Sequence, residues 1–240
     1  MAQLKVYDSE GFEYGRGGRD GRQNEQIRQY FFAGVTIAMD LSGSPKVTGF
    51  FRARETETGR SEQFYASYRG DSTRNLLSNF KSSVERWADR NDMMLVTDTE
   101  DVSIFRKLTG SPGDPPGSAF EHHTLGAVLG RGETVRVGVG SDDDALALLQ
   151  ESVTEHNVSK IAITSDAEGG NLDDFDMVID RGRYRGIEFL GDTEAKVQQV
   201  RPEVEDRIVS ATIDDVQSQI RELRQKTSIG DAELERRFRD

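Results

Sequence analysis

The chain of 240 residues contains no cysteine, only five prolines and a single tryptophan. The absence of cysteine excludes disulfides, thiolate metal sites and a cysteine nucleophile. No run of about 18 apolar residues is present, so no segment is predicted to cross a membrane. The amino-terminal residues do not have the pattern of a signal peptide, and we therefore expect a cytoplasmic protein without a membrane partner.

Lysine is also scarce. Lysine and arginine together number 31 against 43 acidic residues, and the formal net charge is -12. An acidic, lysine-poor composition is typical of cytoplasmic proteins of extreme halophiles, where high salt screens the repulsion between carboxylates. We interpret the chain as halophilic. Most surface acids are then expected to serve solubility rather than chemistry.

The first 27 residues are rich in glycine and are predicted to be a flexible arm, because so many glycines disfavour a helix or strand interior. Arg16, Arg19 and Arg22 stand among these glycines and resemble the arginine–glycine segments that bind RNA. Acidic residues over the same stretch cancel their charge. A nucleic-acid partner and a merely solvated arm are both open alternatives.

Residues 28–110 are predicted to form an α+β meander domain. Strands are expected at 31–40, 46–55 and 62–69, separated by short turns typical of antiparallel pairs. A helix with one apolar stripe is expected to start at Asp71 and to cover this meander.

Two shorter strands, at 93–97 and 102–108, are expected to pair with each other. Three of the five prolines fall in residues 109–117, which we interpret as a linker between two domains.

Residues 118–200 are predicted to form a parallel α/β domain. Strands are expected at 134–139, 159–164 and 175–180, and a helix capped by Ser141 joins the first two. Strands joined by a helix in this way are parallel neighbours. The expected fold is therefore mixed α/β: an antiparallel meander plus a helix, leading into a parallel, flavodoxin-like sheet with a helical tail.

Residues 201–240 are predicted to be that tail. Helices are expected at 192–200, 202–225 and 231–238. Apolar residues follow helical spacing in the second of them: Val204, Ile208, Ala211, Val216, Ile220 and Leu223. Charged helices of this kind often face a partner, so a homo-oligomer or an assembly through the tail is expected.

The second half resembles the carboxyl-terminal part of sugar isomerase (SIS) domains. The resemblance covers residues 134–200 and rests on IAITSDAEGGNLDDFDMVID at 161–180 and GIEFLGDTEAK at 186–196. The residues that match the family pattern are Leu172, Asp176, Val178, Glu188, Thr193 and Lys196.

SIS domains bind phosphosugars with hydroxyl groups and helix-start amides, so the resemblance implies a ligand-binding or regulatory protein for a small phosphorylated molecule. The implied ligand-binding residues are Ser141, Thr164, Ser165 and Thr193, and Glu188 is the implied acid–base residue. Where the family has its phosphate loop, this chain has GSDDD at 140–144, and three carboxylates repel a phosphate. We therefore expect binding without isomerase activity and without a cofactor.

A second interpretation comes from the order of the expected elements, which resembles that of ribonuclease H-like nucleases. Those enzymes hold Mg²⁺ or Mn²⁺ between acidic side chains. The metal ligands would be Asp40, Asp98 and Asp143 or Asp144, with Glu85 as a possible fourth. A third class, a structural or assembly protein of a halophile or its virus, stays open, and so does the presence of enzymatic activity.

Overall fold

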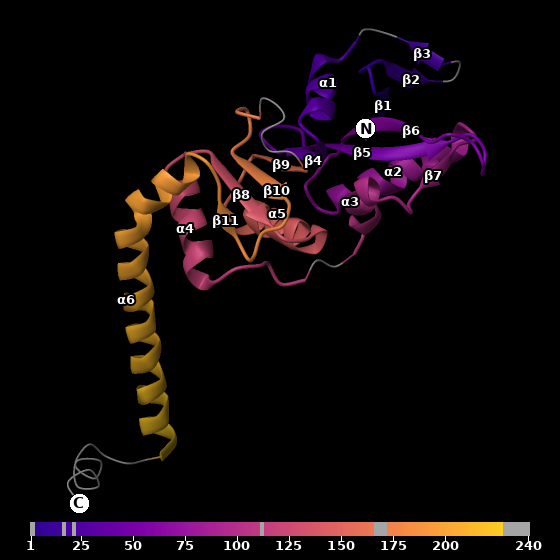
Figure 1. The fold of residues 1–240 in the computed structure, drawn as a ribbon. Helices are drawn as coiled ribbons and strands as arrows, with labels where there is room; N and C mark the ends of the chain where they lie inside the picture. Colours follow the sequence, from indigo (N-terminus) through magenta and orange to yellow (C-terminus); the bar gives the residue numbers. More distant parts are fainter. Residues whose placement is uncertain (1–2, 16–17, 21–22, 111–112, 166–171, 228–240) are drawn as a thin grey trace, which may run out of the picture.

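The computed structural model describes the chain except for residues 1–2, 16–17, 21–22, 111–112, 166–171 and 228–240 (Figure 1). In the first half the elements are β1 (Gln3–Asp8), β2 (Glu13–Gly15), β3 (Gly18–Asp20), α1 (Glu25–Phe32), β4 (Val35–Asp40), β5 (Lys46–Arg54), β6 (Glu62–Arg69), α2 (Leu76–Arg90), β7 (Met94–Val96), the 3-10 helix η1 (Glu100–Val102) and α3 (Ser103–Lys107).

The second half alternates helices with strands before it ends in a long helix. Its elements are α4 (Ala119–Gly130), β8 (Val135–Val139), α5 (Asp142–Glu155), β9 (Lys160–Thr164), β10 (Met177–Arg181), β11 (Glu188–Phe189) and α6 (Thr193–Thr227).

All these strands belong to one mixed sheet of eleven strands, in the order β11-β8-β10-β9-β4-β5-β6-β1-β2-β3, with β7 paired to β5. Strands β8, β10 and β9 are parallel, whereas β4, β5, β6 and β1 are antiparallel. The two parts meet where β4 pairs antiparallel with β9. The mixed α/β fold with antiparallel and parallel strands and a carboxyl-terminal helix is therefore confirmed. The domain boundary placed at 109–117 stays a prediction.

Helices cover both faces of the sheet. On one face, α2, α3 and α5 bury side chains such as Phe80, Phe105 and Leu148 against Phe51 and Ile163 of the strands. On the other face, α1 packs with Leu172 and Phe175 over a smaller cluster. Figure 1 shows α1 on the side of the sheet opposite α2, α3 and α5.

The expectation of a flexible arm over residues 1–27 is wrong for β1. This strand pairs with β6 from Gln3 opposite Arg69 to Asp8 opposite Phe64, and it buries Val6 and Tyr7 on opposite faces of the sheet. Its apolar alternation is too short to stand out beside the glycines that follow. Arg16 and Arg22 lie outside the described residues, and Arg19 lies in β3.

Two other boundaries differ from the expected ones. The strand expected at 31–40 begins only at Val35, because α1 is capped by Asn24, whose side chain accepts from the amides of Gln26 and Ile27, and runs on to Phe32. The strand expected at 102–108 is instead η1 and α3, and β7 pairs with β5.

The tail is continuous where two helices were expected. Pro202 lies inside α6 although it lacks the N–H that a helix interior uses. Val197, Val200 and Val204 are buried on both sides of it, and α6 packs there against α4, which holds the helix together across the proline. The helix expected at 231–238 lies outside the described residues. Among the described helices, none combines the length and the apolar character that crossing a bilayer requires.

Candidate functional site

The carboxyl ends of β8, β9 and β10 meet at the edge of the sheet where the SIS-like pocket was expected. Ser141 caps α5: its Oγ accepts from the Asp144 amide at 3.1 Å and donates to Asp144 Oδ2 at 2.7 Å. Asp142 Oδ1 lies 2.6 Å from Arg181 Nη1, and these side chains are only 14% and 16% exposed. Arg181 also donates to Ser103 Oγ at 2.7 Å. The positive charge of Arg181 at this edge is therefore already paired with a carboxylate of the chain itself.

Tyr184 covers the same edge. A Cβ added to Gly138 or Gly182 would come within 2.6–2.7 Å of the Tyr184 ring. At Gly140 it would lie 2.5 Å from the Tyr184 carbonyl oxygen. The ring is fixed further by its hydroxyl, which donates to Asp180 Oδ2 at 2.7 Å. A side chain larger than glycine at Gly138 or Gly182 would therefore collide with the ring.

The remaining ligand-binding residues predicted from the sequence are bonded to the backbone. Thr164 is fully buried and donates to the Ala33 carbonyl, and Ser165 Oγ donates to the Gly34 carbonyl at 3.4 Å. Thr193 is buried and accepts from the Arg136 amide at 2.8 Å, near the start of β8 rather than its end.

Glu188 lies on β11 and accepts from the Arg185 amide at 3.0 Å. The structure therefore gathers Ser141, Thr164 and Ser165 at one edge of the sheet and places Thr193 toward the other. The predicted ligand-binding residues therefore do not line a single pocket.

The acids predicted to bind metal are also divided between the two edges. Asp40 ends β4 opposite Lys46 and Lys160, whereas Val35 at the start of β4 lies opposite Thr164. Asp40 is thus about 17 Å, the length of β4, from the edge that carries Asp143 and Asp144. Bridged metal ions lie roughly 4 Å apart.

Asp98 follows β7 and Glu85 lies on α2, and both are exposed. Within the described ranges, no three histidines or acids are placed to hold a metal.

Asp40 instead lines a small polar cavity of about 60 Å³ with Tyr30, Lys160 and Asp174. Burial raises the pKa of the Asp40 carboxyl, but hydrogen bonds from Ser42 and the charge of Lys160 lower it more, so the pKa is lowered overall. Burial, with the nearby carboxylates, raises the pKa of Tyr30. This cavity is large enough for water rather than for a substrate.

A much larger groove, of about 760 Å³, lies between the start of α2, α3 and α5. Its apolar lining includes Leu76, Leu108 and Leu146, and its basic residues are Arg74, Arg106 and Lys107. These residues come from separate segments that share no motif. The sequence therefore contains no local pattern from which the groove could be found.

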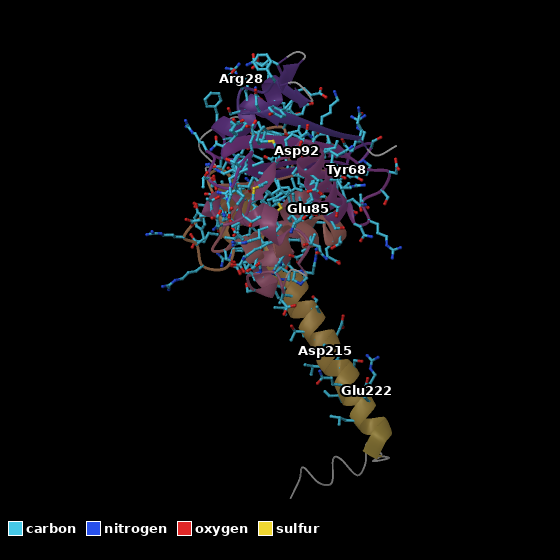
Figure 2. The ribbon with its side chains drawn as sticks, turned by 90° about the vertical axis from the view of Figure 1, so that its right-hand side faces the viewer. Arg28, Tyr68, Glu85, Asp92, Asp215 and Glu222 are labelled. Carbon is cyan, nitrogen blue, oxygen red and sulfur yellow. The ribbon has the colours of Figure 1, made fainter. Side chains whose placement is uncertain are left out.

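The second feature that the sequence only hinted at is an apolar stripe on α6. Five large side chains are exposed along it: Val209 (58%), Ile213 (51%), Val216 (49%), Ile220 (45%) and Leu223 (60%). They recur at alternating spacings of four and three residues, which is the heptad pattern of a coiled coil. Figure 2 shows this part of α6, with Asp215 and Glu222 labelled, standing clear of the rest of the chain.

A titratable cluster lies where α4 meets the end of α5. His122 Nδ1 is 2.9 Å from Glu151 Oε1, and these side chains are 19% and 16% exposed. His156 lies close to Gly126 of α4, where a Cβ would approach its ring to 3.1 Å. Burial is the main cause that lowers the pKa of His156, against the opposing effect of the Glu151 carboxylate.

Because His156 is held neutral by burial, the unfolded chain takes up a proton at higher pH than the native protein. We expect the free energy of unfolding to fall as pH decreases below 6.5, the ordinary pKa of histidine. Above that pH, His156 is neutral in both the folded and the unfolded chain, and it adds no dependence on pH. Urea denaturation at a series of pH values should show a flatter profile for His156→Gln. The same substitution at the exposed His123, whose charge is only a minor cause of the lowered His156 pKa, should change the slope much less, and an unaltered slope in His156→Gln would contradict the assignment.

The fold and these surfaces define a mixed α/β protein with a projecting, heptad-patterned helix. Comparisons of the chain with family models, curated proteins and solved structures found no match, so its function is argued from its geometry.

Proposed function

We propose that this protein is an assembly protein that associates with a second copy of itself through α6. The observation that carries the proposal is the heptad stripe from Val209 to Leu223 on the projecting part of that helix. Apolar side chains at heptad spacing are buried when two helices wind around each other. Single exposed apolar residues are common on protein surfaces, but a continuous stripe marks an interaction site.

The projecting part of α6 has little support of its own. Isolated helices are marginally stable in water, and β-branched residues are poor helix formers. Val209, Ile213, Val216 and Ile220 are all β-branched and lie in this part of the helix. A partner helix would bury these side chains and supply the packing that the helix lacks within one chain.

The stripe also faces the right way for pairing. At 100° per residue, its centre lies roughly 140° around the helix from Val204, the residue that is buried against the body. A second helix can therefore approach the stripe from the side away from α4. Asp215 and Glu222, one heptad apart, lie on another, polar face (Figure 2).

A parallel, in-register pair is favoured over an antiparallel one. The spacing places Ile213 and Ile220 at a positions and Val209, Val216 and Leu223 at d positions. Parallel alignment stacks every one of these residues on its own copy. An antiparallel pair that alternates a against d aligns only four of the five and leaves either Val209 or Leu223 without an apolar residue opposite.

The residues that flank the stripe are compatible with self-pairing. Between Val209 and Leu223 the e and g positions hold Ser210, Thr212, Gln217 and Gln219, which are uncharged, so two identical helices meet without like-charge repulsion along this part of the helix. Ile at a with Leu at d favours two strands, as at Ile220 and Leu223.

Light scattering coupled to size exclusion tests the proposal directly. The wild-type chain should have twice the 26.8 kDa mass of one chain, and Ile213→Glu/Ile220→Glu should have the mass of one. The matched control is Ala211→Glu/Ser218→Glu, which adds the same charge at two exposed positions outside the stripe and should stay dimeric. A monomeric wild type, or a dimer that survives both substitutions in the stripe, would sink the proposal.

The absence of cysteine provides a test of orientation. A single Val209→Cys substitution should crosslink two copies in a parallel pair, because a disulfide needs its Cα atoms within about 7 Å. In the two antiparallel alignments the two positions would be roughly 17 or 27 Å apart. Oxidation should therefore give a covalent dimer on a non-reducing gel if the helices are parallel.

The other functions expected from the sequence stay predictions. The parallel β8–β10–β9 unit supports SIS-like ligand binding. Two observations at the carboxyl ends of these strands count against it: Arg181 is paired with Asp142, and Tyr184 lies against Gly138 and Gly182. The nuclease interpretation, with Mg²⁺ or Mn²⁺, needs Asp40 and Asp143 to converge, and they lie at opposite edges. Nucleic-acid binding by the amino-terminal arginines, the halophilic character and a cytoplasmic location rest on composition alone.

A further inference from the structure

We propose that the groove between α2, α3 and α5 binds a small amphipathic anion, with a carboxylate or phosphate head and an apolar body. The groove's volume of about 760 Å³ falls within the range of small-molecule sites. Three of its lining side chains, Leu76, Leu108 and Leu146, are less than a tenth exposed. The apolar body of the ligand would lie against them.

The head group is selected by charge. Arg74, Arg106 and Lys107 line the groove, and Asp143 is the one acid among its described lining residues. Asp143 is paired with Lys107 at 2.6 Å, which leaves the two arginines as excess positive charge. The chain as a whole has a net charge of -12, whereas the lining of this groove is positively charged. An anion is attracted to such a site and repelled by most of the remaining surface.

The start of α2 adds to this potential. Asn75 precedes the helix with a left-handed backbone (φ 56°) and makes no side-chain cap. Leu77 and Ser78, two first-turn residues that also line the groove, therefore receive no side-chain acceptor for their amides from Asn75. Unpaired amides at a helix start favour negative charge.

The enclosure indicates a small molecule rather than a macromolecule. Lys107 and Asp143 form their ion pair between α3 and α5, so the groove is bridged on that side. Arg106 is held in place because its Nη1 donates to the Thr97 carbonyl at 3.1 Å. An inorganic anion alone would make no contact with the apolar wall that Leu76, Leu108 and Leu146 form, which is why we expect an apolar body.

Calorimetric titration with octanoate and octyl phosphate, with octanol and inorganic phosphate as comparisons, tests the proposal. Octanoate or octyl phosphate should bind one per chain and at least about fivefold more tightly than octanol. Inorganic phosphate should not bind detectably. Shifts of the leucine methyl signals of Leu76 and Leu149 on titration would locate the ligand in the groove.

The variant Arg74→Gln/Arg106→Gln should weaken the binding of the anions by about tenfold and leave octanol unchanged. Arg86→Gln/Arg90→Gln, which removes the same charge from the far end of α2, should leave every affinity unchanged. Equal binding of octanol and octanoate, equal weakening in both variants, or no binding of the anions at millimolar concentration would overturn the proposal. Because the groove and the α6 stripe share no residue, the dimer can be present or absent without affecting this result.

Discussion

Replacement of Arg181 by methionine should lower the free energy of unfolding by about 3 kcal/mol or more. Methionine preserves most of the length of the side chain but leaves Asp142, which is 14% exposed, without its cation. It also removes the donor to Ser103 Oγ, through which β10 holds α3. The position of Asp142 in the first turn of α5 offsets part of the loss, because the helix dipole favours a negative charge there.

Urea denaturation, followed by the fluorescence of the single tryptophan, measures this effect. Asp142→Leu/Arg181→Met should recover most of the stability, because it removes both charges of the pair and leaves no buried carboxylate without a cation. Lys107→Met breaks the more exposed pair with Asp143, whose side chain is 65% exposed, and should cost less than about 1 kcal/mol. If Arg181→Met costs no more than Lys107→Met, the buried pair does not hold the strand edge together.

These ion pairs explain why the expected phosphate loop could be judged only in part from the sequence. The three acids after Ser141 were recognised as unfavourable for a phosphate, and the helix that they begin was placed correctly. Their partners Arg181 and Lys107 could not be assigned, because one lies on a later strand and the other on a helix that was expected to be a strand. Pairing across such distances is a property of the packed fold and leaves no local pattern.

The elements that were predicted well are those with a strong local pattern. Strands β5 and β6 and the β8–α5–β9 unit have clear apolar spacing and clear breaks, and their bounds differ little from the expected ones. Strand β1 and helix α3 lack such clear apolar spacing and breaks. Their conformation depends on the strand or helix that packs beside them, and the sequence does not show which element that is.

The apolar spacing of α6 shows a different limit. A single stripe from Val204 to Leu223 was expected, but the structure divides it. Val204 is buried against the body, whereas Val216, Ile220 and Leu223 are exposed. Helical spacing shows that residues share a face, but only the position of the body shows where that face changes from core to surface. The heptad spacing of the exposed part becomes meaningful once this division is known.

Replacement of Phe51 by alanine should lower the free energy of unfolding by about 3–5 kcal/mol. Phe51 is completely buried in the middle of β5 and is surrounded by rings from three other elements. Its ring centroid lies 5.5 Å from that of Phe64, 5.7 Å from Trp87 and 5.9 Å from Phe105. Alanine would leave a cavity among these aromatic side chains, because α2, α3 and the sheet are held apart by the remaining rings.

The same fluorescence-detected urea denaturation measures this loss, since Trp87 is one of the rings around the cavity. Phe32→Ala is the matched control: its side chain is 70% exposed, and we expect a change within about 0.5 kcal/mol. The dependence on urea concentration should stay the same in both variants, because neither changes the surface exposed on unfolding by much. A loss below 1 kcal/mol in Phe51→Ala would mean that α2 and α3 close over the cavity. That outcome would contradict the rigid packing of α3 against the sheet, on which the shape of the groove depends.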